Sequence, residues 1–189
     1  MALPISQVLS RIRIFLDGIV QGVGFRPFIY RCAKERGFAG FVENISDGVI
    51  IEVQGNRHDL NDFVKHILAG HPPSARISDI RTKEIFIADD ADFVIKKSRE
   101  SHSKGPLFPP DFSVCDDCLK ELFNPSNRRY RYPFINCTGC GPRFTIIKGL
   151  PYDRPLTSMA SFKMCPECLM EYTDPFDRRF HAEPNACPL

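Results

Sequence analysis

The pattern of hydrophobic and polar positions predicts alternating strands and helices over residues 10–98. Apolar residues first alternate with polar ones, which predicts a strand with one buried face: Ile12, Ile14 and Leu16. Apolar residues then recur at helical spacing: Phe28, Ile29, Cys32 and Ala33. Pro27 suits the first turn of this helix, and Gly37 suits its end.

A hairpin and a second helix follow in the pattern. Residues 38–45 and 49–53 predict two strands joined around Ser46-Asp47-Gly48. A helical stripe comes next and is stopped by His71-Pro72-Pro73: Leu60, Phe63, Val64, Ile67 and Leu68. Residues 77–87 and 93–95 predict two further strands.

The resulting order, βαββαβ with one possible extra strand, predicts an α+β domain over residues 10–98. This order is typical of a ferredoxin-like sandwich, in which two helices cover one face of a sheet. Residues 99–113 have the Ser, Gly and Pro content of a linker. Beyond them the periodicity fades and cysteine pairs appear, so we expect small metal-stabilised modules at 114–147 and 148–189.

Seven of the eight cysteines lie in this second part of the chain, in pairs at short spacing. Cys115 and Cys118 are followed, after 18 residues, by Cys137 and Cys140. Two residues between thiols allow one turn to present both sulfurs to one ion, and the C-x2-C-x18-C-x2-C spacing is typical of a tetrahedral zinc site. We therefore predict a structural zinc ion on these four cysteines.

The cysteine pattern recurs fifty residues later, with Cys165, Cys168 and Cys187. Other residues match at the same offset: Leu119/Leu169, Glu121/Glu171, Pro125/Pro175, Arg128/Arg178, Arg129/Arg179 and Tyr130/Phe180. The counterpart of Cys140 would be residue 190, so we expect the sequence to be a fragment whose second zinc site lacks its fourth ligand. His181 is the alternative fourth ligand, although its position in the repeat favours an ordinary loop histidine.

The charge of the chain argues against a nucleic-acid partner. Residues 1–100 carry 14 basic and 13 acidic side chains, and residues 101–189 carry 11 and 10. A protein that binds phosphate backbones is usually far more basic. The Arg128-Arg129 and Arg178-Arg179 pairs, beside aromatic residues, could stack on bases. We favour ion pairs and cation–π contacts inside the small modules instead.

A glycine-containing segment links the first strand to the first helix. Gly22 and Gly24 allow backbone conformations in which successive amides converge on an anion at a helix start. Arg26 adds a planar fork that suits two phosphate oxygens. We predict phosphate binding by residues of this segment: Gln21, Gly22, Val23, Gly24, Phe25 and Arg26.

Asn44 lies near the end of the strand that enters the hairpin. An amide is no strong base, but it holds a water molecule by donating and accepting hydrogen bonds. An acyl phosphate already carries a good leaving group, so a positioned water and neutralised phosphoryl oxygens suffice for hydrolysis. Taken alone, the glycine segment is about as compatible with a tight turn and a surface arginine, and for Asn44 a turn-capping role is the commoner case.

Together the two motifs are specific. Gly18-x-Val-Gln-Gly-Val-Gly-Phe-Arg26, followed by Gly40-x-Val-x-Asn44-x-x-Asp-Gly48, resembles the acylphosphatase family over residues 10–98. By this resemblance Arg26 corresponds to the catalytic arginine that binds phosphate, and Asn44 to the asparagine that positions water.

The cysteine region resembles a narrower family. The two C-x-x-C pairs, the segment from Arg128 to Ile147 and Cys165-Pro-x-Cys168 resemble the twin zinc fingers of hydrogenase-maturation carbamoyltransferases of the HypF type. This resemblance implies that carbamoyl phosphate is the substrate and that further domains use ATP to form a carbamoyl-adenylate. It also implies a partner protein whose carboxy-terminal cysteine accepts the carbamoyl group, which becomes a cyanide ligand of [NiFe] hydrogenases.

The sequence leaves two hypotheses for the function. The first is hydrolysis of carbamoyl phosphate or another acyl phosphate at Arg26 and Asn44, without a cofactor for that step and with structural zinc beside it. The second is a non-catalytic, zinc-dependent module that binds protein or RNA. No long apolar run and no signal peptide are evident, so we expect a cytoplasmic protein and no membrane partner.

Overall fold

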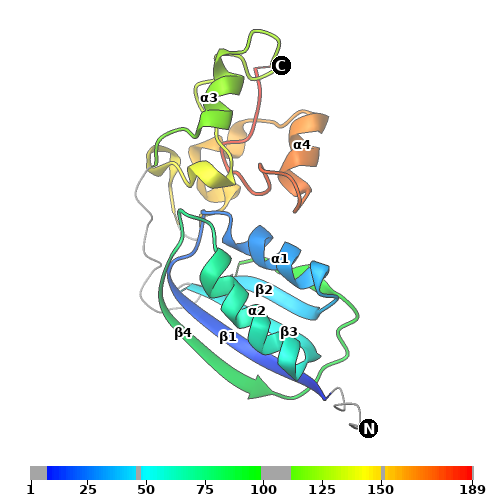
Figure 1. Cartoon of the computed structure of the whole chain (residues 1–189). Coiled ribbons are helices and arrows are strands. Elements are labelled where there is room, and N and C mark those ends of the chain that lie inside the picture. Colours follow the sequence, from blue (N-terminus) through cyan, green and yellow to red (C-terminus); the bar gives the residue numbers. More distant parts are fainter. Residues whose placement is uncertain (1–7, 46–47, 99–111, 150–151, 189) are drawn as a thin grey trace.

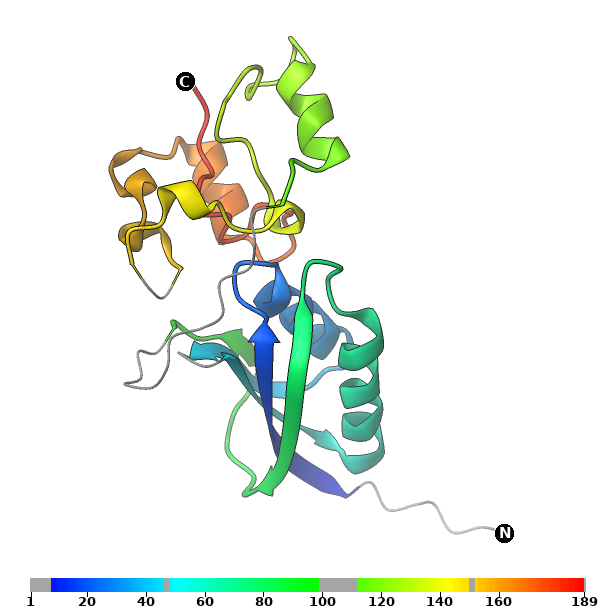
Figure 2. The same cartoon turned by 90° about the vertical axis from the view of Figure 1, so that its left-hand side faces the viewer.

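The computed structural model describes residues 8–45, 48–98, 112–149 and 152–188. Its first part is an open sheet with two helices on one face, and its second part is built of turns and short helices (Figure 1). The described ends of the chain lie at opposite ends of the molecule, as a perpendicular view also shows (Figure 2).

Five strands form the sheet in the order β4-β1-β3-β2-β5. Their bounds are β1 Leu9–Ile19, β2 Ala39–Ile45, β3 Gly48–Asn56, β4 Arg76–Ile85 and β5 Phe93–Ile95. All neighbours are antiparallel except β2 and β5, which pair in parallel. The predicted βαββαβ sandwich is confirmed, and the possible extra strand is β5.

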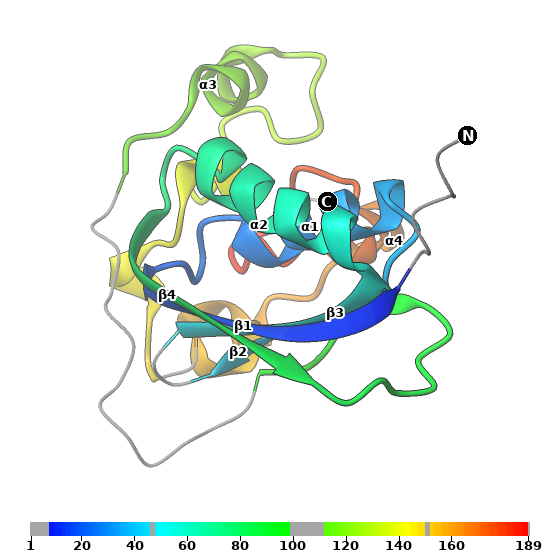
Figure 3. The ribbon, with the colours of Figure 1, turned by 60° about the horizontal axis from the view of Figure 1, so that its bottom comes forward.

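Helices α1 (Phe25–Glu35) and α2 (Arg57–Gly70) lie side by side over one face of the sheet (Figure 3). The core between helices and sheet includes Ile14, Ile29 and Phe63, all fully buried. Alternation places charged residues of β1 on the opposite face, where Arg11 and Arg13 both pair with Glu52. The period-2 pattern of β1 therefore separates the core from a polar face.

Two details differ from the sequence pattern. Helix α1 begins at Phe25 rather than Pro27, because Gly24 adopts a left-handed conformation (φ 75°) that starts the helix two residues earlier. In α2 the buried side chains are Leu60, Phe63 and Ile67, whereas Leu68 is exposed. The apolar stripe of α2 is therefore narrower than predicted.

The cysteine region consists of two similar modules. Helices α3 (Asp116–Phe123) and α4 (Pro166–Thr173) lie fifty residues apart, and each is followed by the same series of turns. Equivalent backbone bonds hold these turns: Arg131 N donates to Leu122 O and His181 N to Tyr172 O, at 2.9 and 3.1 Å. Arg131 and His181 share a left-handed backbone, with φ of 59° and 50°. The internal repeat is thus a repeat of structure.

The connection between the two parts falls largely outside the described residues. Of the predicted linker at 99–113, only residues 112 and 113 are described. Short 3-10 turns lie at Thr138–Cys140, Phe144–Ile146, Arg154–Leu156 and Ser158–Ser161, between helices α3 and α4. Within the described part of the chain, no helix has the length and apolar character needed to cross a membrane.

Candidate active site and metal centres

The glycine-containing loop joins β1 to the first turn of α1 and is fixed to the neighbouring hairpin. Gly22 and Gly24 both have positive φ, 68° and 75°. The side chain of Gln21 donates from Nε2 to the carbonyl oxygens of Ile45 and Gly48, at 2.6 and 3.0 Å. The loop is therefore held against the end of β2, close to Asn44.

Arg26 and Asn44 lie in direct contact although they come from a helix and a strand. They are 8% and 2% exposed. With its amide oxygen turned toward the guanidinium, Asn44 accepts from Nε at 3.0 Å and from Nη2 at 3.2 Å. Arg26 Nη1 also donates to Ser98 Oγ at 3.4 Å. A cation, a fixed amide and a left-handed glycine loop thus converge at the start of α1.

The cysteine region covers this loop. A Cβ atom on Gly22 would lie 3.2 Å from side-chain atoms of both Pro142 and Tyr152, and one on Gly24 would lie 3.0 Å from Thr138 Cβ. Positive φ favours glycine at both positions, and the close packing leaves little room for a side chain there.

Three polar residues of the cysteine region also lie beside Arg26, a position that the sequence pattern did not predict. Asp153 Oδ1 is 3.7 Å from Arg26 Nη2. The ligand atoms of Asp153, His181 and Glu183 lie within 4.8 Å of one another. Their distance along the chain from Arg26 concealed this proximity. The sequence does mark two of them, because the two repeats differ there: His181 and Glu183 correspond to Arg131 and Pro133.

The four predicted ligands of the first zinc site are gathered in one cluster. The sulfur atoms of Cys115, Cys118, Cys137 and Cys140 lie within 4.8 Å of one another. Zn–S bonds of ~2.3 Å in a tetrahedron separate the sulfurs by about 3.8 Å. The Cys115–Cys137 and Cys137–Cys140 sulfur distances are 3.7 and 3.8 Å. The donor set and its spacing therefore fit zinc.

The second site gathers three thiols among the described residues. Cys165, Cys168 and Cys187 form one group, with 3.6 Å between the sulfurs of Cys165 and Cys187. His181 belongs to the separate group with Asp153 and Glu183. His181 is thus grouped apart from the three thiols, and it lines the same recess as Arg26.

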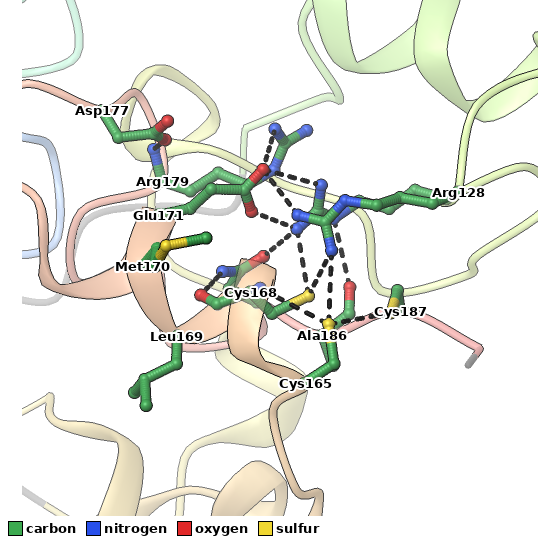
Figure 4. Close-up of polar contacts among 12 residues, drawn as sticks. Arg128, Cys165, Cys168, Leu169, Met170, Glu171, Asp177, Arg179, Ala186 and Cys187 are labelled. Atoms are coloured by element: carbon green, nitrogen blue, oxygen red, sulfur yellow. Dashed lines mark hydrogen bonds and ion pairs between the residues drawn. The ribbon is translucent and has the colours of Figure 1, made fainter.

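The paired arginines connect the two modules to each other. Arg128 donates to Cys168 Sγ at 2.8 Å and pairs with Glu171 at 2.6 Å (Figure 4). Reciprocally, Arg178 donates to Cys118 Sγ at 2.7 Å.

The second arginine of each pair repeats the exchange: Arg129 pairs with Glu171, and Arg179 with Glu121. The predicted ion pairs exist, but most of them run between the modules. Inside the second module, Arg179 also lies 4.0 Å from Glu171. One cation–π contact is internal to a module, with Arg131 over the ring of Tyr130 at 5.5 Å.

This exchange balances the charge of the cysteine clusters. A zinc ion with four thiolates has a net charge of −2, and the guanidinium groups donate hydrogen bonds to the sulfurs from outside the ligand shell. Burial raises the pKa of the Cys168 thiol to about 11, and the hydrogen bond from Arg128 opposes that rise. Zinc and arginine together thus favour the thiolate form.

We expect each arginine to affect the zinc site of the opposite module. Arg128→Ala should release zinc from Cys165, Cys168 and Cys187 at a lower chelator concentration than in the wild type, because the thiolates lose a donor and a positive charge. Arg178→Ala should weaken the first site in the same way. Chelator titration of the two variants, with site-resolved zinc content, checks this. Zinc loss confined to the module that carries the replaced arginine would contradict the reciprocal arrangement.

Comparison with known proteins agrees with both parts of the structure. The acylphosphatase family matches residues 12–95, and the HypF finger family matches residues 114–147 and 164–189. An acylphosphatase of Thermotoga petrophila is 38% identical over 89 residues, which cover 47% of this chain and 98% of that protein. The sheet domain thus corresponds to a whole protein in another organism.

Longer relatives match both parts together. Carbamoyltransferase HypF2 of Cupriavidus necator is 52% identical over 154 residues, which cover 80% of this chain and 19% of that protein. The crystal structure of full-length HypF in its phosphate- and nucleotide-bound form superposes with a TM-score of 0.89 at 48% identity, covering 96% of this chain and 24% of that one. The chain spans about a fifth of the length of the curated carbamoyltransferases it matches. With an acylphosphatase domain, HypF fingers and nearly half of its residues identical to these proteins, the chain belongs to the HypF carbamoyltransferase family.

Proposed function

We propose that this chain hydrolyses acyl phosphates, with carbamoyl phosphate as the substrate, at the site formed by Arg26 and Asn44. The observation that carries the proposal is the contact between these two buried side chains beside the left-handed glycine loop. A buried arginine beside the amides of a left-handed glycine loop is suited to a dianionic phosphoryl group. The membership in a family of acylphosphatase domains supports the same reaction.

The chemistry follows from the positions of these groups. Loop amides and the Arg26 guanidinium hold the phosphoryl oxygens and offset the charge that develops on them. Asn44 orients a water molecule for in-line attack on phosphorus. The bond from the water oxygen to phosphorus forms as the bond from phosphorus to the acyl oxygen breaks. The products are inorganic phosphate and the carboxylate, which is carbamate when the substrate is carbamoyl phosphate.

The role of the whole protein extends this proposal. Relatives over four-fifths of the chain are named carbamoyltransferases, and a similar full-length protein is described with phosphate and nucleotide bound. We infer that the carbamoyl product is passed to ATP-using domains of the same parent protein. From there it reaches a cysteine of a hydrogenase-maturation partner, in cyanide ligand synthesis. Hydrolysis itself uses no cofactor in this proposal.

Zinc has a structural role in this arrangement. Bound by the cysteine clusters, it supplies the cross-links that small modules without a large core need. The apolar clusters of the cysteine region are small, and one of them includes the zinc-site thiols Cys118, Cys137 and Cys140. The segment that covers the glycine loop begins at these cysteines, so the metal also fixes the cover over the active site.

A second candidate function is a zinc-dependent interaction module in which the first domain only binds an anion. Exposed aromatic residues on the cysteine region favour it: Phe123, Phe144 and Phe176. Phosphate release from carbamoyl phosphate by the zinc-loaded chain separates the two functions. Turnover above the spontaneous rate supports the hydrolase, and binding of phosphate without turnover supports the interaction module.

Asn44→Ala should lower kcat by about a hundredfold while the affinity for inorganic phosphate stays nearly unchanged. The reason is that the water loses its partner, and misplacing a reactant by about 1 Å costs on the order of a hundredfold. Steady-state kinetics and phosphate inhibition measure the two effects. Asn61→Ala, on the outer side of α2, is the matched control and should retain wild-type values. A weaker phosphate affinity with normal kcat would place Asn44 in anion binding instead.

A further inference from the structure

A recess beside Arg26 is lined by groups of all three structural units. Gly22, Gly24 and Arg26 come from the acylphosphatase domain, and Asn136 and His181 come from the first and second zinc modules. The recess measures about 20 Å³, which is room for about one water-sized group. It therefore adjoins the proposed phosphate loop but is closed by residues outside the acylphosphatase domain.

Two polar atoms in the walls of this recess have no hydrogen-bond partner among the described residues. They are Oδ1 of Asn136 and Nδ1 of His181. Asn136 is only 3% exposed. Buried polar atoms are rarely left unpaired in folded proteins, and such an atom beside a ligand site indicates a partner supplied by the ligand or by water. An amide oxygen is an acceptor, and Nδ1 of a neutral imidazole accepts in the tautomer that carries its proton on Nε2.

The His181 ring is held in place by its surroundings. It stacks on Tyr172, with ring centres 5.1 Å apart and planes at 7°. Burial, with the nearby Arg26 charge, lowers the pKa of His181 to about 4, so the ring is neutral near pH 7. Beside it, Asp153 approaches Arg26, and Glu183 accepts from the Tyr172 hydroxyl at 2.7 Å. The surroundings of the recess are rich in hydrogen-bond acceptors.

The repeat provides an internal comparison for these residues. Asn136 corresponds to Ala186, and His181 and Glu183 correspond to Arg131 and Pro133. The turns that carry these pairs have equivalent backbone bonds. The module fold therefore requires neither the amide at 136 nor the imidazole at 181. In each of these repeat pairs, the residue that lies near Arg26 is the one with the amide or the imidazole.

We infer that Asn136 and His181, with Asp153 beside them, recognise the amino group of carbamoyl phosphate and select it over other acyl phosphates. This inference rests on the proposed hydrolysis at Arg26 and Asn44. Carbamoyl phosphate differs from acetyl phosphate by an amino group in place of a methyl group of similar size. The amino group donates two hydrogen bonds, and a methyl group in the same place leaves the acceptors buried without partners. The zinc modules thereby add selectivity to a domain that supplies the hydrolysis.

The experiment compares kcat/KM for carbamoyl phosphate and acetyl phosphate, measured by phosphate release from the zinc-loaded chain. The wild type should favour carbamoyl phosphate. Asn136→Ala, which installs the residue of the other repeat, and His181→Phe, which keeps the ring stack, should each lower kcat/KM for carbamoyl phosphate by about tenfold to a hundredfold. Both should leave acetyl phosphate within about twofold. Arg131→Ala, at the exposed counterpart of His181, is the control and should change neither value.

The outcomes separate this inference from the proposed hydrolysis. Equal kcat/KM for the two substrates in the wild type would overturn the inferred selectivity and leave the proposed hydrolysis unchallenged. This outcome needs only the wild type, so it holds even if neither variant folds. Equal losses on both substrates, with zinc content and melting unchanged, would assign Asn136 and His181 a general role and also overturn it. Hydrolysis of neither substrate would refute the proposed function itself. A ratio that changes on addition of Mg²⁺ would instead assign Asp153, His181 and Glu183 to a cation.

Discussion

Replacing Arg26 by alanine should reduce hydrolysis of carbamoyl phosphate by about a thousandfold or more. The Arg26 guanidinium contacts Asn44, lies 3.7 Å from Asp153 and lines the same recess as the glycine loop. Loss of one preorganised donor to a developing oxyanion already costs about a hundredfold to a thousandfold, and here the charge is lost as well. Phosphate inhibition should weaken in parallel, because the ground state uses the same guanidinium.

Arg26→Lys tests whether geometry or charge matters. An ammonium group is a point charge without the planar fork, so it cannot contact two phosphoryl oxygens and Asn44 together. We expect about a hundredfold loss for this variant. Arg36→Ala, at the exposed end of α1, removes an equal charge away from the site and is the matched control. Near-normal turnover by Arg26→Ala would refute the assigned role, and recovery by lysine would reduce that role to simple charge.

The sheet domain was largely predictable because its information is local. Alternation in β1, the stripe of α2 and the turn residues between them each specify an element within a few residues. The choice of Arg26 and Asn44 as site residues followed from the joint resemblance of two motifs rather than from either one, and their direct contact is seen only in the structure. Residues that the pattern misplaced lie where tertiary packing decides: Leu68 has a helical apolar position but is 44% exposed.

The cysteine spacing predicted which thiols gather, but it carried no information on how the modules meet. In an internal repeat, Arg128 is equally well placed by sequence to pair with Glu121 of its own module or with Glu171 of the other. Only the packed structure distinguishes these choices, and it selects the reciprocal one. The approach of Asn136, Asp153 and His181 to Arg26 was hidden for the same reason, since it depends on how two separate units pack together.

Replacing Cys137 by serine should remove the first zinc ion and unfold the cysteine region, while the sheet domain stays folded. A serine hydroxyl is a poor zinc ligand, and the folding free energy of such modules comes largely from the metal. The sheet domain has its own apolar core, which shares no residue with the cluster around Cys118, Cys137 and Cys140. Two melting transitions in the wild type should therefore become one. Cys32→Ala is the control: it alters a buried cysteine of α1, should cost about 1 kcal/mol of sheet-domain stability, and should retain all zinc.

The same variant also tests how far the two modules depend on each other. The amide of Thr138, next to the altered residue, donates to Arg178 O at 2.8 Å, and Arg178 in turn reaches Cys118. Collapse of the first module removes Cys118 from Arg178 and Glu121 from Arg179. It also withdraws Arg128 and Arg129 from Cys168 and Glu171. We therefore expect the second zinc to be lost at chelator concentrations that the wild type withstands. Because the cover over the glycine loop is lost as well, any remaining hydrolysis should no longer distinguish carbamoyl from acetyl phosphate. A second module that keeps its zinc with wild-type affinity would show that the arginine exchange contributes little to its stability.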